Sequence, residues 1–349
     1  MKYTIRNALT GNTFQAKEDE SILDAALRQG VTIAYSCRNG ACASCHGVVL
    51  AGRVVYPHGR PQALNEAMRV AGNALFCQAH AASDLVIEVA EIEAVKDIPV
   101  SLFPARVIDK TRLAKDVVRL RLKLPAARRI LFLAGQYIDL IQSDGKRRAF
   151  SIASPSHQDG ELELHIRHVD GGDFTGYVFD TLKVGAIVRF EGPKGTFFVR
   201  HDSDRPILMM AGGTGFAPLK SMLEQLFVDG LDRPVHVYWG ARGQADLYAL
   251  DCAGAWANEH DLVRFTPVLS HPAARDHWRG RTGLVHQAVL DDHSELTRFD
   301  VYMSGPPAMI DAARESFLAR GLPEDRLFYD SFDFAPDVAL KIARKPRPG

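Results

Sequence analysis

Four cysteines in the first quarter of the chain have the spacing of iron–sulfur ligands. Four residues separate Cys37 from Cys42, two separate Cys42 from Cys45, and 31 separate Cys45 from Cys77. This spacing is typical of thiolate ligands to a 2Fe–2S cluster. The residues between the first three cysteines are small or include Asn and Gly, which tolerate the left-handed backbone angles that a tightly wrapped loop requires. We therefore predict a 2Fe–2S centre at these four cysteines.

Structural zinc and disulfide bonds are the alternative uses of these thiols. Zinc sites usually combine two closely spaced pairs, whereas here three thiols are crowded together and one is remote. Disulfides are disfavoured because the total of five cysteines is odd and residues 1–30 show no signal-peptide pattern. We expect a reduced, cytoplasmic protein in which Cys252 is an ordinary half-buried thiol of a helix.

Residues 1–95 are predicted to position the cysteine loop. Ser21 is expected to cap a short helix that Gly30 ends, and a second helix is expected over 64–71. Strands are expected over 2–6, 13–16, 47–50 and 85–90. A mixed sheet that grips one helix is the β-grasp arrangement of plant-type ferredoxins, which this segment resembles. Residues 96–104 contain two prolines and are predicted to form a linker.

The charge balance argues against several classes of partner. Lys and Arg together number 42, as do Asp and Glu, and no run of 18 apolar residues occurs. We expect no nucleic-acid partner and no membrane span. The first 95 residues hold eight basic and nine acidic residues, so we expect charge steering to matter little for a partner of that domain. Residues 336–349 are predicted to be a basic, flexible tail.

Residues 105–202 contain six short β-prone runs, which predict an antiparallel barrel. Within them, Arg148, Phe150 and Ser151 would suit a flavin: a charge for a phosphate, a ring to stack and a hydroxyl to donate. Thr175, expected just before a short helix over 176–182, offers a second anion seat. Ordinary alternation along strands could also place such residues without any ligand. The expected strands are 106–108, 117–122, 136–140, 149–152, 162–169 and 187–190.

Residues 203–335 are predicted to form a nucleotide domain. An apolar strand over 207–211 leads through a glycine-rich turn, 212–218, into a helix over 219–228, and such a turn lets amides approach a pyrophosphate. The alternation continues over 235–239, 247–257, 263–269, 285–290, 301–303 and 308–319. It predicts an α/β doubly wound parallel sheet with its ligand at the carboxyl ends of the strands. Arg242 and Arg264 could each reach a 2′-phosphate, so NADPH stays open, although we expect NADH.

These motifs resemble those of the ferredoxin–NADP reductase superfamily. Residues 148–151 are similar to its Arg-x-Tyr-Ser signature, with Phe150 in place of the tyrosine, and residues 212–218, 238–242 and 304–307 are similar to its nicotinamide-dinucleotide loops. The resemblance implies FAD, in preference to FMN, and NADH or NADPH as substrate. The implied flavin contacts are Arg148, Phe150, Ser151, His165, Ile166, Arg167 and Thr175. The implied nucleotide contacts are Gly212, Gly213, Thr214, Gly215, Pro218, Gly240, Arg242, Gly305 and Pro306.

Two residues are implied to lie at the reacting rings. Ser304 stands beside the nicotinamide, where many relatives have Cys, and Phe332 stands where relatives carry an aromatic that shields the flavin. Simple packing is the alternative for Phe332. The predicted electron path runs from NAD(P)H to the flavin and then, one electron at a time, to the cluster.

The domain order resembles two groups of reductases that feed electrons to a partner protein. One group serves the terminal oxygenases of aromatic-ring-hydroxylating systems, which we expect as the acceptor class. The other is the CDP-6-deoxy-glucoseen reductases of dideoxysugar biosynthesis, which serve a dehydrase. A non-enzymatic flavin and iron–sulfur redox sensor is the remaining alternative.

Overall fold

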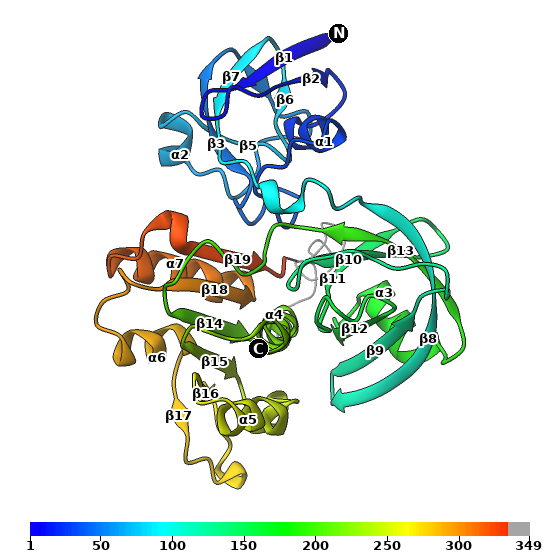
Figure 1. Cartoon of the computed structure of the whole chain (residues 1–349), viewed down its shortest axis with the longest axis vertical. Coiled ribbons are helices and arrows are strands. Elements are labelled where there is room, and N and C mark those ends of the chain that lie inside the picture. The colour runs from blue at the N-terminus through cyan, green and yellow to red at the C-terminus, as the bar shows by residue number, and fades with distance from the viewer. Residues whose placement is uncertain (334–349) are drawn as a thin grey trace. The chain divides into compact units, whose positions relative to one another are not determined.

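The computed structural model describes residues 1–333, which fold into two compact units (Figure 1). The first contains Met1–Pro99 together with Lys194–Thr196, and the second contains Val100–Pro193 and the chain from Phe197 onward. The predicted tail, 336–349, lies outside the described residues. Within residues 1–333, no helix is both long enough and apolar enough to cross a membrane.

The first unit is the predicted β-grasp domain. Its mixed sheet has the order β2-β1-β7-β3-β5, in which β1 and β7 are parallel and the other pairs are antiparallel. The strands are β1 (Lys2–Asn7), β2 (Thr13–Lys17), β3 (His46–Ala51), β5 (Asn73–Leu75) and β7 (Leu85–Glu88), with β4 (Val54–Val55) paired to β6 (His80–Ala81). The helices are α1 (Ile22–Arg28), α2 (Glu66–Val70) and the short η1 (Glu93–Val95).

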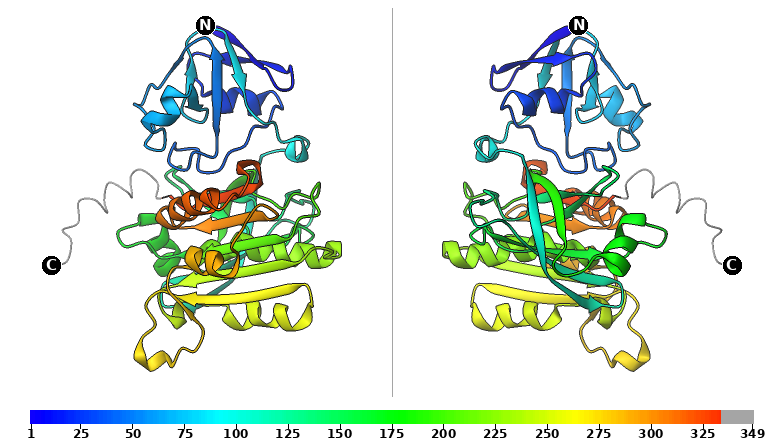
Figure 2. Two further views of the ribbon diagram at one scale, coloured as in Figure 1. Left: turned by 90° about the vertical axis from the view of Figure 1, so that its left-hand side faces the viewer. Right: turned by 90° about the vertical axis from the view of Figure 1, so that its right-hand side faces the viewer.

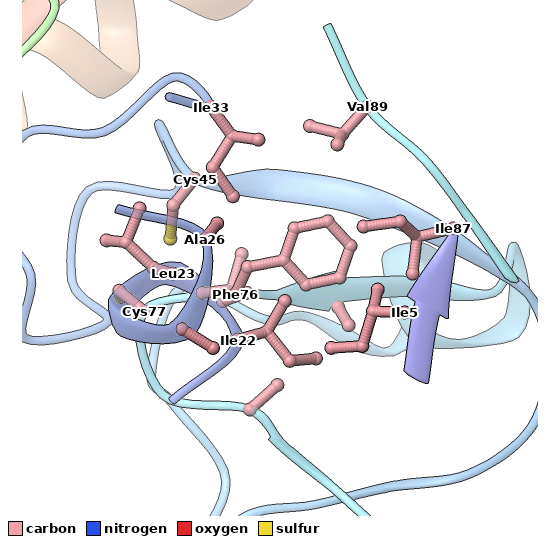
Figure 3. Close-up of a cluster of buried hydrophobic side chains, with 14 of the residues drawn as sticks. Ile5, Ile22, Leu23, Ala26, Ile33, Cys45, Phe76, Cys77, Ile87 and Val89 are labelled. Atoms are coloured by element: carbon pink, nitrogen blue, oxygen red, sulfur yellow. The ribbon is translucent and has the colours of Figure 1, made fainter. Parts of the chain in front are cut away.

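Helix α1 lies against the core of this sheet, as the sequence predicts. The backbone amide of Asp24 donates to the Ser21 hydroxyl at 3.0 Å, and the chain leaves the helix at Gly30, whose φ is 77°. Ile22 and Leu23 are fully buried by this packing. Figure 3 shows Cys45 and Cys77 among the side chains of the same core, so the thiols are positioned by the packing around α1.

The six predicted strands of the second domain form a closed antiparallel barrel. The order is β11-β10-β13-β8-β9-β12, and a bridge between Ile152 and Leu164 joins the two ends. The right-hand view of Figure 2 shows β8 and β13 side by side. The strands are β8 (Ser101–Ala114), β9 (Val117–Lys123), β10 (Tyr137–Ile141), β11 (Arg147–Ser151), β12 (Glu161–Arg167) and β13 (Ile187–Lys194). The connection from β12 to β13 contains α3 (Asp173–Gly176) and the π-helical turn η2 (Tyr177–Thr181).

The predicted linker was wrong for residues 101–104. Ser101 to Pro104 begin β8 and pair with Gly192 to Arg189 of β13. Partner strand β9 joins β8 only from Arg106 onward, so Pro104 lies where β8 has a single neighbour. A proline, which has no N–H to donate, is tolerated at such a position.

The nucleotide domain is a parallel sheet with helices on both faces, as predicted. The order is β17-β16-β15-β14-β18-β19. Side chains of β14 alternate between two cores, one built with α4 and α5 and one with α6 and α7, and Figure 1 shows these helix pairs on opposite sides of the sheet. The strands are β14 (Ile207–Gly212), β15 (Val235–Ala241), β16 (Val263–Leu269), β17 (Arg281–Thr282), β18 (Asp300–Gly305) and β19 (Leu327–Ser331). The helices are α4 (Phe216–Asp229), α5 (Leu250–Glu259), α6 (Val285–Asp292) and α7 (Pro307–Ala319), with single turns η3 (Gly213–Gly215), η4 (Gln244–Asp246), η5 (Ala274–Asp276) and η6 (Glu324–Arg326).

Candidate functional site

The four predicted cluster ligands lie together as two thiol pairs. Cys37 is hydrogen-bonded to Cys42, and Cys45 to Cys77. Cys45 and Cys77 are buried in the core, whereas Cys37 and Cys42 are only half-buried. All five cysteines are free of disulfide bonds, and Cys252 is half-buried in α5, as predicted. No three His, Cys, Asp or Glu side chains within residues 1–333 are placed to hold a single metal ion.

The backbone of the cysteine loop is arranged to donate to sulfur. Hydrogen bonds from the Cys42 thiol and from the amides of Asn39, Ala41 and Cys42 outweigh burial and lower the pKa of Cys37 to about 7. Donors that lower the pKa of a thiol favour the thiolate, which is the form that binds metal. Four thiols arranged as two pairs match a two-iron cluster, in which each iron takes two protein ligands.

The left-handed positions of the loop are only partly those expected. Gly40 has φ of 79°, as its type allows, but the other two positions are Arg38 at 57° and Ala43 at 60°. Asn39 instead uses its side chain to accept the backbone N–H of Ala41 at 3.1 Å. Non-glycine residues in this region are uncommon and store strain, and such strain clusters at functional sites.

The predicted flavin residues lie on β11 and β12. The Ser151 hydroxyl donates to Asp330 Oδ2 of β19 at 3.3 Å, which joins the barrel to the nucleotide sheet. The rings of Phe150 and Phe174 are tilted, with centroids 5.5 Å apart, and Phe150 is half-buried. Arg148 is also half-buried on β11, and one of its guanidinium nitrogens donates to the Arg147 carbonyl at 2.8 Å. A ring, a hydroxyl and a cation therefore lie on one short strand.

Arg167 offers the clearest unsatisfied donors near these residues. Its Nε is 3.2 Å from Asp116 Oδ2, yet neither Nε nor Nη2 makes a hydrogen bond, although both atoms are buried. A Cβ on Gly213 would lie 3.0 Å from Nη1, so the guanidinium of the barrel meets the glycine turn of the nucleotide domain. Buried, unsatisfied guanidinium nitrogens are costly, and an anionic group such as a phosphate would satisfy them.

His165 and Ile166 are placed differently from their neighbours. The side chain of Ile166 is fully buried in the barrel core, so only its main chain could face a ligand. His165 Nε2 lies 3.0 Å from Glu163 Oε1, and Nδ1 lies 3.0 Å from the Tyr248 hydroxyl. Burial lowers the pKa of His165, so the neutral ring donates to the carboxylate and accepts from the phenol. Its side chain is fully occupied by protein partners.

Thr175 does not precede a helix, contrary to expectation. Helix α3 begins at Asp173, so Thr175 is inside it. Its hydroxyl accepts from the Val169 amide at 3.0 Å and donates to the Gly172 carbonyl at 3.2 Å. A helical turn of Asp173–Gly176 followed by a π-turn replaces the single helix predicted over 176–182.

The glycines predicted to bind the nucleotide lie at the carboxyl edge of the parallel sheet, where β14, β15 and β18 end. A Cβ on Gly215 would lie 2.0 Å from the Ser304 carbonyl oxygen, and one on Gly240 would lie 2.8 Å from Val285 Cβ. A Cβ on Gly305 would lie 3.0 Å from the Gly212 Cα, and one on Gly212 would lie 2.6 Å from Met309 Sδ. No side chain fits at these positions, because neighbouring protein atoms already occupy the space that a Cβ would take, so the loops that end the strands pack closely together. Thr214 is buried in η3, Pro218 is buried in the first turn of α4, and Pro306 is exposed at the start of α7.

Ser304 and Phe332 lie at this same edge. Ser304 is fully buried, and its hydroxyl oxygen has no hydrogen-bond partner. The Phe332 amide donates to the Gly305 carbonyl at 2.9 Å, so Phe332 follows directly from the end of β19. An orphaned buried hydroxyl beside a glycine-lined edge fits a polar ligand group, such as the carboxamide of a nicotinamide.

The two arginines considered for a 2′-phosphate are separated by the length of a strand. Arg242 is exposed directly after β15, at the carboxyl edge. Arg264 is the second residue of β16, at the opposite edge. The expectation that Arg264 could reach the same phosphate was therefore wrong. Arg264 lies at the start of its strand, whereas a nucleotide binds where the parallel strands end.

Trp239 is a functional candidate that the sequence reasoning missed. Its indole Nε1 donates to the Gly213 carbonyl at 2.9 Å, and its ring is stacked on Phe216 with centroids 4.0 Å apart. The two contacts hold both ends of the glycine turn, at Gly213 and at Phe216, against the side chain of Trp239. The available signal was the position of Trp239 in the buried run just before Gly240.

Comparisons with known proteins agree with this arrangement. Residues 7–82 match the 2Fe-2S iron-sulfur cluster binding domain, 104–199 the oxidoreductase FAD-binding domain and 209–315 the oxidoreductase NAD-binding domain. The chain is 40% identical over 332 residues to the CDP-6-deoxy-L-threo-D-glycero-4-hexulose-3-dehydrase reductase of Yersinia pestis, covering 95% of this chain and 99% of that one. It is 36% identical over 352 residues to the phenol 2-monooxygenase reductase component DmpP of Pseudomonas sp. strain CF600, covering 99% and 98%.

A solved structure has a similar fold over nearly the whole chain. The cytochrome P450 reductase GcoB of Amycolatopsis has a TM-score of 0.77 and 32% identity, and the match covers 95% of this chain and 98% of that one. The ferredoxin reductase of carbazole 1,9a-dioxygenase has a TM-score of 0.70 and 28% identity, covering 95% and 99%.

Proposed function

Because the chain belongs to the family of reductases that join a 2Fe–2S domain to FAD-binding and NAD-binding domains, we propose that it delivers electrons to a separate acceptor protein. The protein is an oxidoreductase that carries electrons from NAD(P)H through FAD to a 2Fe–2S cluster. FAD supplies the conversion between a hydride, which carries two electrons, and the single electrons that the cluster accepts. One observation carries the proposal: a single chain contains all three parts of the path. They are the loop with paired cysteines, the Arg167 guanidinium with buried nitrogens that make no hydrogen bond, and the closely packed glycines at the carboxyl edge of the parallel sheet.

The chain's own residues act by binding and orientation. We assign the flavin to Arg148, Phe150, Ser151 and Arg167, with Arg167 donating to an anionic oxygen through Nη2, which makes no hydrogen bond, while Nε stays ion-paired with Asp116. We assign the nicotinamide to the edge at Ser304, where a buried hydroxyl can hold a polar substituent in place. Positioning of this kind, and not acid–base chemistry, is the expected contribution of the protein.

The acceptor is proposed to be a terminal oxygenase component. Reductase components of phenol and propane monooxygenases and of terephthalate dioxygenase are among the relatives of the chain. A sugar dehydrase is the second candidate, because the relative at 40% identity is a dehydrase reductase. Turnover of a ring-hydroxylating oxygenase supplied with this protein and NADH supports the first candidate; turnover of the dehydrase alone replaces it with the second.

The electron path is tested by replacing one cluster ligand. Cys42→Ser should abolish reduction of cytochrome c by NADH while sparing reduction of ferricyanide, which accepts electrons from the flavin. Cys252→Ser is the matched control, because it removes a half-buried thiol outside the loop. Equal loss of both activities in folded, FAD-loaded Cys42→Ser protein would contradict the proposed order. Absence of turnover in the unmodified, fully loaded protein would favour the redox sensor.

The proposed donor is NADH, and Arg242 provides the test. Stopped-flow absorbance with NADH and with NADPH measures flavin bleaching and cluster bleaching separately. We expect faster bleaching with NADH, and we expect Arg242→Ala to lower only the rate with NADPH. Faster reduction by NADPH in the unmodified protein would reverse the assignment.

A further inference from the structure

The charges of the first unit are unevenly distributed along the chain. From Cys37 to Ala81, the segment that carries all four cluster ligands, there are four arginines and one acidic residue, Glu66. The other eight acidic residues of the first 95 lie before or after this segment. A domain that is nearly neutral as a whole is therefore basic in the part that holds the cluster.

Three of these arginines are brought together at the cysteine loop. Arg38 is part of the loop itself. A Cβ on Gly40 would lie 2.8 Å from Pro61 Cβ, and the Ala63 amide donates to the Gly40 carbonyl at 3.2 Å, so the segment that contains Arg60 packs on the loop.

Arg69 joins the same group through a shared carboxylate. Glu66 pairs with Arg60 at 3.2 Å and with Arg69 at 2.5 Å. Arg60, Arg69 and Glu66 are 55%, 55% and 60% exposed. One carboxylate cannot neutralise two guanidinium groups, and exposed pairs of this kind contribute little stability, so both arginines can exchange partners.

We propose that this arginine rim, defined as Arg38, Arg60 and Arg69, docks an acidic surface of the electron-accepting protein. The inference rests on the proposed function, since it names the chemistry of the partner. A basic rim at the loop that holds the cluster attracts an acidic partner to the place where the electron leaves, which raises the association rate and sets the orientation.

This inference revises the expectation drawn from net charge. Two acidic residues contact the rim: Asp24 of α1 pairs with Arg38, and Glu66 is shared by Arg60 and Arg69, so three arginines face two carboxylates. Screening at physiological salt limits the reach of an exposed charge to about 8 Å, so more distant acidic residues of the domain count for little. Local charge, and not the balance of the whole domain, decides whether docking is steered.

The test compares matched pairs of charge reversals. Arg60→Glu with Arg69→Glu alters the rim, whereas Lys2→Glu with Arg6→Glu makes the same change in net charge on β1, whose neighbours are β2 and β7. Arg60→Gln with Arg69→Gln serves as a second rim variant that introduces no carboxylate beside Glu66. Each full-length protein is loaded with both cofactors, reduced with dithionite and desalted without oxygen.

The readout is the rate of electron delivery to two protein probes of opposite charge. With acidic cytochrome b5, the rate constant at low salt should fall about tenfold in the reversed rim variant, less in the neutral one, and little in the β1 control. With basic cytochrome c the rim reversal should leave the rate unchanged or raise it. Added salt should remove these differences.

Three results would overturn the inference. They are equal effects of the rim and β1 variants, a fall in the rate with cytochrome c as large as that with cytochrome b5, and a rim variant that mainly slows reduction of the cluster by NADH. The last result would assign the arginines to electron transfer within the chain. Failure of NADH to reduce the cluster in unmodified protein would instead refute the proposed function, because the dithionite-reduced protein still reports on the rim.

Discussion

Glu163 is predicted to stabilise the protein through a buried network between the barrel and the nucleotide domain. Its carboxylate accepts from His165 at 3.0 Å and lies 3.3 Å from the ammonium group of Lys220 on α4. Lys220 also pairs with Glu224 at 2.8 Å and donates to the Ala153 carbonyl at 3.2 Å. The Glu163 side chain is 17% exposed, so solvent screens these contacts weakly.

The magnitude follows from the pKa of Glu163. Burial alone would raise this pKa, but the hydrogen bond from His165 and the charge of Lys220 outweigh it and lower the pKa from 4.5 to about 2. A difference of this size corresponds to about 3 kcal/mol of folding free energy. Because the folded-state pKa is depressed, this stabilisation is present above pH 4.5 and is lost as the pH falls toward about 2.

We expect Glu163→Gln to lower the free energy of unfolding by about 3 kcal/mol at neutral pH, measured by urea denaturation. The difference in unfolding free energy between the variant and the unmodified protein should narrow as the pH falls from 4.5 toward about 2. Over that range Glu163 is protonated in the unfolded state but still charged in the folded state, which favours unfolding of the unmodified protein. Glu161→Gln on the same strand is the control: its carboxylate pairs with Arg121 and Lys123 at the surface, and its loss should cost less than about 1 kcal/mol. Equal costs for the two variants, or a gap that does not change with pH, would refute the reasoning.

Three further predictions concern the nucleotide domain. Gly215→Ala should prevent NADH from reducing the flavin, followed by stopped-flow absorbance, because the new Cβ would lie 2.0 Å from the Ser304 carbonyl. Trp239→Phe should keep the stacked ring but remove the donor to Gly213, so KM for NADH should rise several-fold while the melting temperature falls by only a few degrees; a larger loss of stability without a change in KM would make Trp239 purely structural. Burial lowers the pKa of His236 from 6.5 to about 4, so unfolding free energy should fall as the pH drops from 6.5 toward 4, and His236→Gln should flatten that dependence in urea titrations.

The sequence predicted the parts of the molecule that depend on local patterns. Cysteine spacing predicted the paired thiols, and the apolar runs located all six barrel strands and the parallel strands β14, β15, β16 and β18, but not the two-residue β17. It also missed β19, Leu327–Ser331, although three of its five residues are Leu, Phe and Tyr. The start of β8 was also missed, because prolines usually interrupt strands. Only the strand register shows that Pro104 pairs with β13 on one side and has no neighbouring strand on the other.

The sequence could not show which polar residues are paired with one another. Glu163 and Lys220 are 57 positions apart and read separately as surface charges, but the fold brings them together in a buried network. His165 was expected to contact the flavin, and its assignment stays a prediction, but the structure shows both ring nitrogens occupied. Pairings between distant elements depend on the packing of barrel against helix α4, which no local pattern encodes.

The state of each buried polar group separates positioning residues from binding residues. A buried group with all its partners is stable without a ligand, whereas one without partners costs roughly 1–3 kcal/mol until something satisfies it. Glu163, His165 and Lys220 belong to the first kind. Arg167 Nη2 and the Ser304 hydroxyl belong to the second, and we propose that they contact the flavin and the nicotinamide, respectively. Since a fold tolerates such a cost mainly where function requires it, these atoms support both proposed assignments.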